Sequence, residues 1–409
     1  MSRYQELKAK YDEYCTKKLN LTMARGNPST QQIKLSQELL TNLKEDDYLA
    51  EGNIDCRNYG QMEGIPEMKR IFSDITGFAP EEIIIGGNSS LNIMFDNVSV
   101  NMHMGPREGK PWAEQGKVKF LCPSPGYDRH FSVTEYFNVE MIPIQMTGSG
   151  PNMDAIEKLT SEDPMIKGIW CVPIFSNPTG ETYSDETVRR FASLKAAPDF
   201  RIFWDNAYCV HNFRGERRVI PNILRECEKA GNPDRPIIFT SFSKIGFPGN
   251  AVAMMASSKA NCAYMRKRLS FQTIGPDKLN QLRYVRFFKN AEGVYTHMKK
   301  HAEIIGPKFE LVNEILEKNL KGKNIASWTN PDGGYFISFD SAPGCAKRIV
   351  ELCKNAGLTL TGAGSCFPLM KDPEDRNIRI APSFPPMEDL RTAMELFCIA
   401  AEMAALELV

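Results

Sequence analysis

The stretch Ser241-Phe242-Ser243-Lys244 closes an apolar run at 236–241 that has the composition of a strand buried on both faces. Upstream, Asp205-Asn206-Ala207-Tyr208 follows a second run of this kind at 201–205. The interval between the two stretches leaves room for one helix and the next strand. A lysine in this position can hold an aldehyde covalently, because the pKa of a lysine falls readily near positive charge or away from water. The two stretches therefore predict neighbouring strands whose reactive side chains meet at one edge of a sheet.

A third segment, Ser176-Asn177-Pro178-Thr179-Gly180, follows another apolar run at 167–173. Ligands of mainly parallel sheets sit at the carboxyl ends of the strands, and Asn177, Asp205 and Lys244 all fall there. An aspartate together with an aldehyde-holding lysine suits pyridoxal phosphate (PLP), whose ring nitrogen must be protonated to accept electrons. The segments together predict one shared pocket for this cofactor.

Helix and strand patterns alternate along the chain from about residue 65. The alternation predicts an α/β fold with a mainly parallel central sheet and helices on both of its faces. The helix candidates are 64–76, 90–102, 126–137, 184–195 and 221–230, and the strand candidates are 82–86, 117–122, 139–144, 167–173, 201–205, 236–241 and 250–256.

The pattern changes after about residue 290, where long predicted helices at 292–318 and 387–406 flank strand candidates at Gly334–Asp340 and Asn377–Ala381. These elements predict a second, smaller α+β domain, and 409 residues exceed what a single core usually holds. Apolar residues at helical spacing over 4–18 predict a terminal helix that packs on the small domain or on a partner subunit.

We therefore expect three parts. They are an N-terminal segment (1–55) that belongs to the small domain and the subunit interface, a large PLP-binding domain (56–290) and a C-terminal small domain (291–409).

Charge and cysteine usage narrow the class of protein. The 50 Lys and Arg residues balance 50 Asp and Glu residues, which argues against a nucleic acid or an anionic membrane as a partner. The sequence has no apolar run long enough for a membrane span, and its charged N-terminus lacks the apolar core of a signal peptide. The 11 cysteines are scattered without a C-x-x-C pair, as in a reduced cytoplasmic protein. We interpret His297 and His301 as a solvated helix face and expect no metal site.

The chain resembles the class I/II PLP-dependent aminotransferases of fold type I, from Arg25-Gly26-Asn27-Pro28-Ser29 to Asn377-Ile378-Arg379-Ile380. Within that group it is most similar to the Ic subgroup of aspartate aminotransferases, through Arg57-Asn58-Tyr59-Gly60, Pro125-Gly126-Tyr127-Asp128-Arg129-His130 and Ile274-Gly275-Pro276-Asp277-Lys278. The resemblance implies a cytoplasmic homodimer that moves an amino group between aspartate and 2-oxoglutarate. The reaction is then ping-pong and passes through the pyridoxamine form of the cofactor.

The resemblance also implies roles for individual residues. Lys244 holds the cofactor and moves the proton of the substrate Cα, while Asp205 keeps the pyridine nitrogen protonated. Tyr208 and Asn177 hydrogen-bond the phenolic oxygen of the cofactor. Tyr127 lies against the cofactor ring, where stacking adds on the order of 1 kcal/mol to burial.

The expected phosphate cup combines Ser89 and Ser90, which open a helix after Gly86-Gly87-Asn88, with Ser241 and Ser243. By family analogy, Tyr59 reaches the phosphate from the neighbouring subunit. Relatives usually carry an arginine shortly after the Pro-Gly that follows the lysine, but Phe247-Pro248-Gly249-Asn250-Ala251-Val252 has none. Our candidate replacement is Lys278, acting from its own or the neighbouring subunit, and the second choice is Arg283.

The substrate contacts follow from the same resemblance. Arg379 clamps the α-carboxylate beside Asn177, and Gly26 lets the N-terminal segment approach the substrate. A second carboxylate needs a second cation, and Arg25 and Arg129 are both candidates.

Three other functions are weighed against this one. An aminotransferase for aromatic or other neutral amino acids, or a β-lyase, would share Lys244, Asp205 and Arg379. A PLP-binding transcriptional regulator predicts a basic DNA-binding module, but only about 25 residues precede the Arg25-Gly26 motif. A nicotinamide dehydrogenase predicts G-x-G-x-x-G after the first strand, and the sequence lacks it.

Overall fold

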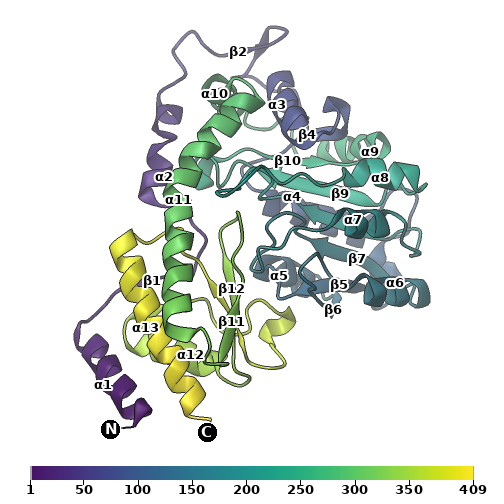
Figure 1. Cartoon of the computed structure of the whole chain (residues 1–409). Coiled ribbons are helices and arrows are strands. Elements are labelled where there is room, and N and C mark those ends of the chain that lie inside the picture. Colours follow the sequence, from purple (N-terminus) through teal and green to yellow (C-terminus); the bar gives the residue numbers. More distant parts are fainter. Residues whose placement is uncertain (1, 409) are drawn as a thin grey trace.

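The computed structural model describes residues 2–408, and its largest element is a seven-stranded sheet (Figure 1). The strand order is β4-β10-β9-β8-β7-β5-β6. Only β10 runs antiparallel to its neighbours β4 and β9, which confirms the expected mainly parallel α/β sheet. The strands are β4 (Ile83–Ile85), β5 (Lys119–Ser124), β6 (Glu140–Gln145), β7 (Ile166–Cys171), β8 (Arg201–Asp205), β9 (Pro236–Ser241) and β10 (Ala253–Ala256).

Both faces of this sheet are buried, because successive residues of a strand point to opposite sides. In β8, Ile202 and Trp204 join one apolar cluster, whereas Phe203 joins another. The first cluster packs against α3 (Pro66–Thr76), α6 (Met153–Glu162), α7 (Asp185–Ala192), α8 (Ile223–Lys229) and α10 (Lys278–Phe288), and the second against α4 (Ser90–His103), α5 (Asp128–Tyr136) and α9 (Lys259–Leu269).

A three-stranded antiparallel sheet in the order β11-β12-β14 lies below the first sheet in Figure 1. It shares a core with long helices, and Phe339 of β12 packs edge-on against Phe397 of the last helix. The elements are α11 (Ala291–Leu320), β11 (Ala326–Trp328), β12 (Ile337–Ser341), α12 (Ala346–Asn355), β13 (Leu358–Thr359), β14 (Asn377–Ile380) and α13 (Met387–Leu406).

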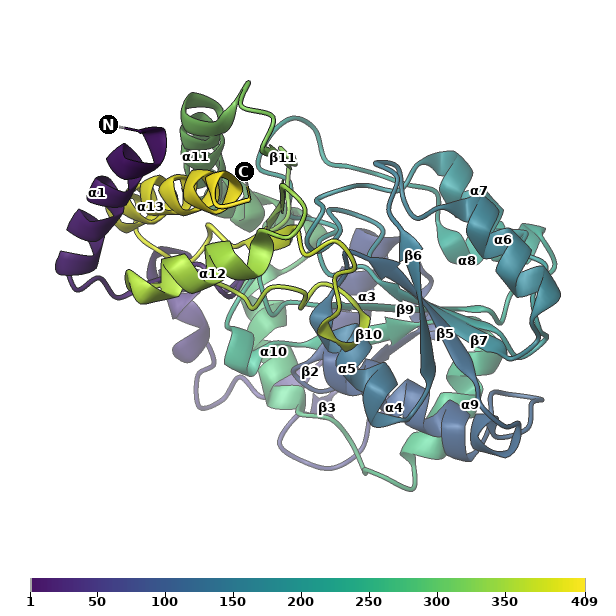
Figure 2. The same ribbon diagram turned by 90° about the horizontal axis from the view of Figure 1, so that it is seen from below.

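The N-terminal segment joins this second core. Helix α1 (Arg3–Thr16) lies beside α13 in both views (Figures 1 and 2), and the buried Tyr11 donates a hydrogen bond of 2.9 Å to the carbonyl of Leu352. Strand β1 (Leu21–Thr22) pairs in parallel with β13. The remaining short elements of the segment are α2 (Thr30–Lys34), β2 (Leu49–Ala50) and β3 (Ile54–Asp55).

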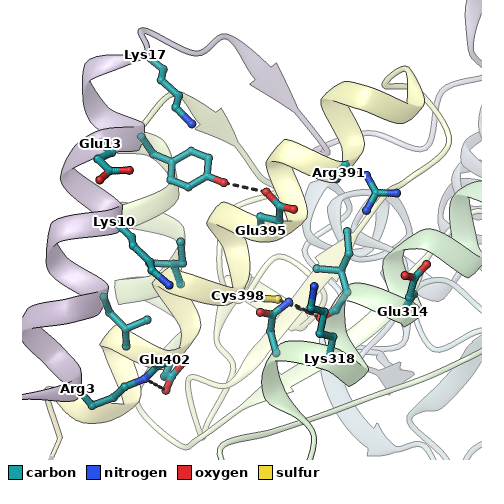
Figure 3. Close-up of a pocket in the computed structure, with 15 residues that line it drawn as sticks. Arg3, Lys10, Glu13, Lys17, Glu314, Lys318, Arg391, Glu395, Cys398 and Glu402 are labelled. Carbon is teal, nitrogen blue, oxygen red and sulfur yellow. Dashed lines mark hydrogen bonds and ion pairs between the residues drawn. The ribbon is translucent and has the colours of Figure 1, made fainter.

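A surface groove of about 360 Å³ is lined by residues of α1, α11 and α13 (Figure 3). Two contacts join α1 to α13 along this groove. Arg3 pairs with Glu402 at 2.8 Å, and the Tyr14 hydroxyl donates to Glu395 at 3.0 Å. None of the side chains that line the groove is among the predicted cofactor or substrate ligands. The groove therefore belongs to the packing of α1 and not to the site described below.

Helix α11 joins the two cores, since Val294 and Met298 belong to the cluster of the large sheet and Phe309 and Val312 to that of the small sheet. On these grounds we propose the domain division 56–290 and 291–409, with residues 1–55 packed mainly on the smaller part. Within residues 2–408, no helix is long and apolar enough to cross a membrane.

The interpretation of His297 and His301 as solvent-exposed is wrong. Both imidazoles are buried, and their Nε2 atoms lie 3.1 Å apart. The inner face of α11 turns them towards Gln32, which bonds His301 at 3.0 Å, and Ser36, which bonds His297 at 3.2 Å. Burial lowers the pKa of both histidines. In the part of the chain that the structure describes, no group of His, Cys, Asp or Glu is placed to hold a metal.

Candidate active site

Three adjacent strands bring the predicted residues together. Asp205 is the last residue of β8, Lys244 follows the end of β9 by three residues, and Asn177 lies beyond the end of β7. Because β7, β8 and β9 are parallel neighbours, their carboxyl ends meet at one edge. The Lys244 ammonium lies 5.2 Å from the ring centre of Tyr208. The site is thus assembled where the strand pattern places it.

The amine of Lys244 is easily deprotonated in this position. Burial lowers the pKa of Lys244, the Asp205 carboxylate opposes that shift, and the Arg379 guanidinium adds to it. Tyr335 donates to the Lys244 carbonyl at 3.3 Å and fixes the backbone there. A neutral amine is the form that attacks an aldehyde, so the environment suits the covalent role predicted for this lysine.

Asp205 is buried and only half satisfied. Its Oδ2 lies 3.1 Å from Nε2 of His130, whereas Oδ1 has no hydrogen-bond partner among the described residues. The His130 ring is stacked on Trp170 with centroids 4.4 Å apart. A buried carboxylate oxygen without a donor is costly, and a protonated ring nitrogen of a bound cofactor would supply that donor.

No role was predicted for His130 from the sequence. The only indication was its position in the Pro125–His130 motif. Tyr127 meets the same imidazole edge-on with centroids 4.9 Å apart, and burial raises the pKa of Tyr127 to about 12. Burial likewise raises the pKa of Tyr208 well above its ordinary value. Both phenols therefore act as neutral hydrogen-bonding groups.

His211 was also missed. It is buried beside Tyr208 and Tyr335, and neither of its ring nitrogens has a partner among the described residues. Burial, followed by the charge of Lys244, lowers the pKa of His211 to about 3. The imidazole is therefore neutral next to the lysine.

Arg379 lies at the boundary between the two sheets, on β14. Its NH1 donates to Asp128 at 2.9 Å and to Asn177 at 3.3 Å. The guanidinium carbon lies 4.8 Å from the ring centre of Phe336. A Cβ atom on Gly26 would lie 2.4 Å from that ring. Gly26 thus leaves room for Phe336, the ring that lies beside Arg379. The role of Gly26 at the substrate stays a prediction.

The serines predicted for a phosphate cup share one edge. Ser89 caps α4 without a side-chain capping bond, and Ser90 begins that helix. The hydroxyls of Ser241 and Ser243 lie 2.7 Å apart. Strands β4 and β9 flank β10 and both run antiparallel to it, so the segments that follow β4 and β9 leave the sheet at the same edge. Hydroxyls and backbone N–H groups at a helix N-terminus suit an anion.

Lys278 and Tyr59 are linked to each other. The buried ammonium of Lys278 donates to the carbonyls of Asn58 at 2.7 Å and Gly60 at 3.0 Å, on either side of Tyr59. Tyr59 itself is 80% exposed. Two of the three N–H groups of Lys278 are therefore used within the chain, and the tyrosine projects away from it.

The three arginines whose roles the sequence leaves undecided differ in burial. Arg25 and Arg129 are exposed, and Arg283 is half-buried. Arg129 is two residues from Tyr127 in the chain, and its positive charge opposes the rise of the Tyr127 pKa. The geometry leaves both Arg25 and Arg129 open as partners of a second carboxylate.

The chain is similar to known aminotransferases along its whole length. The family model described as aspartate amino-transferase matches residues 1–409. A curated aspartate aminotransferase of Corynebacterium glutamicum is 45% identical over 99% of this chain and 94% of its own. A crystal structure of an aspartate transaminase of the same species is also 45% identical, with a TM-score of 0.97, over 99% of this chain and 96% of that one.

A more distant structure, the α-aminoadipate aminotransferase LysN of Thermus thermophilus complexed with N-(5'-phosphopyridoxyl)-L-leucine, shares the fold at 18% identity. Its TM-score is 0.78, over 98% of this chain and 96% of that chain. The resemblance to the PLP-dependent aminotransferases of fold type I is confirmed, while the Ic subgroup stays a prediction, and this chain belongs to the aspartate amino-transferase family.

Proposed function

We propose that this aminotransferase binds PLP at Lys244 and transfers the amino group between aspartate and 2-oxoglutarate in two half-reactions. The observation that carries the proposal is the convergence at one sheet edge of a half-buried lysine of lowered pKa, a buried carboxylate with one oxygen that has no partner among the described residues, and a buried arginine. The relation to a Corynebacterium glutamicum protein named aspartate aminotransferase supports the choice of substrate.

Bound PLP supplies an electron sink for the bonds at the substrate Cα. Asp205 would bond the protonated ring nitrogen of the cofactor through Oδ1, while His130 keeps Oδ2 in place. Lys244 would hold the cofactor, and its neutral amine would take and return the proton of the substrate Cα. Tyr208 and Asn177 would hydrogen-bond the phenolic oxygen of the cofactor.

The remaining residues bind and orient. Arg379 holds the α-carboxylate, and Tyr127 covers the cofactor ring. The phosphate is held by the hydroxyls of the cup: Ser89, Ser90, Ser241 and Ser243.

We propose further that the protein is a homodimer in which Tyr59 reaches the partner's phosphate. Tyr59, Phe271 and Ile274 are all exposed, and a hydrogen bond of 3.2 Å from the Gly60 N–H to the Ile274 carbonyl holds their loops together. A surface that carries large apolar side chains on adjacent loops suits a subunit interface.

Lys278 is expected to support phosphate binding from this interface. Lys278→Met should raise the dissociation constant for PLP about 10-fold or more, the usual effect of losing hydrogen bonds from a charged group. Catalysis at saturating PLP should fall less. The measurement is a fluorescence titration of the cofactor-free protein with PLP, and Arg283→Met tests the second candidate in the same way.

Tyr59→Phe separates the two ways in which Lys278 can act. If the lysine acts by holding the tyrosine loop, Tyr59→Phe should weaken PLP binding as well. If the third N–H of Lys278 instead contacts the phosphate directly, Tyr59→Phe should weaken PLP binding less than Lys278→Met does. Unchanged PLP affinity in Lys278→Met refutes a role of this lysine in phosphate binding.

Either Arg25 or Arg129 should read the distal carboxylate. Replacing the correct arginine by leucine should lower kcat/KM for aspartate about 100-fold, since a charged hydrogen-bonded pair is lost, and leave alanine and phenylalanine nearly unchanged. Steady-state kinetics with the three amino acids test this. Equal losses on all amino acids would assign the arginines to the fold or the cofactor. A native enzyme that prefers phenylalanine or alanine would replace the aspartate proposal with a neutral-substrate aminotransferase.

A further inference from the structure

The guanidinium of Arg379 is bonded unevenly. NH1 carries the two short contacts, to Asp128 at 2.9 Å and to Asn177 at 3.3 Å. NH2 has only a contact of 3.5 Å to the Thr361 hydroxyl, and Nε has no hydrogen-bond partner among the described residues. Arg379 is nevertheless only 6% exposed. The protein thus satisfies one end of a buried cation and leaves the other end open.

The open end is the one that a carboxylate needs. The N–H of Nε and one N–H of NH2 point the same way and form a two-pronged edge that matches both oxygens of a carboxylate. Asp128 is bonded to NH1, away from that edge. The aspartate and a substrate α-carboxylate can therefore be bonded to Arg379 at the same time.

Simultaneous binding has an electrostatic cost, because two carboxylates then share one guanidinium in a largely buried site. The side chain of Asp128 is 30% exposed, so water screens part of its charge. Two other charged groups of the site need to be considered. Arg129 follows Asp128 in the chain and is exposed, and the Asp205 carboxylate is paired with His130 through Oδ2. Asp128 is the carboxylate bonded directly to Arg379.

We propose that Asp128 is a positioning residue with two effects on the α-carboxylate site. It holds NH1, so that the Nε–NH2 edge of Arg379 faces the substrate, and its negative charge limits how tightly that edge binds a carboxylate. The inference rests on the proposed function only in taking an α-amino acid as substrate. It holds for any such substrate, because each carries the same α-carboxylate.

The test separates the charge of Asp128 from its hydrogen bond. Asp128→Asn keeps an oxygen that accepts from NH1 and removes the charge, whereas Asp128→Ala removes both. Calorimetric titration of the cofactor-loaded enzyme with succinate and with propionate measures carboxylate binding without turnover. We expect Asp128→Asn to lower both dissociation constants about 3- to 10-fold. Asp128→Ala should bind both acids more weakly than Asp128→Asn.

Steady-state kinetics give a second readout. In Asp128→Asn, the KM values for aspartate and for alanine should fall by similar factors. Asp185→Asn, which loses a negative charge from an exposed pair with Arg189, is the control and should match the unmodified enzyme. Thermal melting and cofactor absorbance verify that each variant is folded and loaded.

Two results would overturn the proposal. One is an Asp128→Asn protein that binds propionate no more tightly than the unmodified enzyme, since charge then has no part in binding. The other is Asp128→Ala binding as tightly as Asp128→Asn, since NH1 then needs no holding. Propionate has a single carboxylate, so its titration stays decisive even if the enzyme proves not to prefer aspartate.

Discussion

Lys244→Ala should lose at least about 10⁴-fold in transamination rate while remaining folded, because one side chain both holds the cofactor and moves the Cα proton. The loss should appear in each half-reaction measured separately by stopped-flow absorbance. Added methylamine should restore a small part of the rate, since an external base can replace the missing amine. A variant that keeps more than about 1% of the rate would contradict the role.

Lys308 makes a demanding control. It is buried, its pKa is lowered to about 8 by burial, and its ammonium donates to the carbonyls of Ser383 and Pro385. Borohydride reduction of the loaded enzyme should fix the cofactor mass on the peptide that contains Lys244. Label on the Lys308 peptide would show that low pKa and burial, without the neighbouring Asp205, suffice to hold the cofactor.

Asp205→Ala should slow removal of the Cα proton on the order of 10³-fold, because the loss of a preorganised charge acts on the transition state. Some cofactor should stay bound, since Lys244 and the serine cup are intact. The measurement is a single-turnover reaction with α-deuterated aspartate, in which a larger isotope effect marks proton removal as the slowed step.

Asp199→Asn is the matched control, at the residue two positions before the same strand. Asp199 lies just before β8 and pairs with Lys167 at 2.8 Å, at the opposite edge of the sheet from Asp205. Its loss should affect stability and leave the single-turnover rate unchanged. A near-normal half-reaction rate in Asp205→Ala would remove this residue from the chemistry.

The sequence predicted the large sheet well, because its strands are continuous apolar runs that end in polar, chemically specific residues. The runs before Asp205 and Lys244 match β8 and β9 residue for residue. Helices α9 and α10 were not predicted. Helix α9 buries only Asn261, Cys262 and Met265, so it lacks a clear apolar stripe. In α10 the buried positions include Lys278 and Asn280, which sequence patterns assign to the surface.

Side-chain partners were harder to predict than the positions of the elements. His130 meets Asp205, and Asp128 meets Arg379, across 75 and 251 residues of sequence. Nothing local in the chain signals either pairing. The buried histidines of α11 show the same difficulty, since their partners Gln32 and Ser36 belong to the N-terminal segment. Polar residues on a helix are read as exposed unless such a distant partner is known.

One single-turnover experiment tests the proposed transamination most directly. PLP-loaded protein is mixed with aspartate in the absence of any 2-oxo acid, and the products are quantified. We expect one oxaloacetate per active site, no free ammonia, and recovery of the amino group as glutamate once 2-oxoglutarate is added. Release of ammonia with continued turnover of aspartate, or the absence of oxaloacetate, would contradict transamination of aspartate.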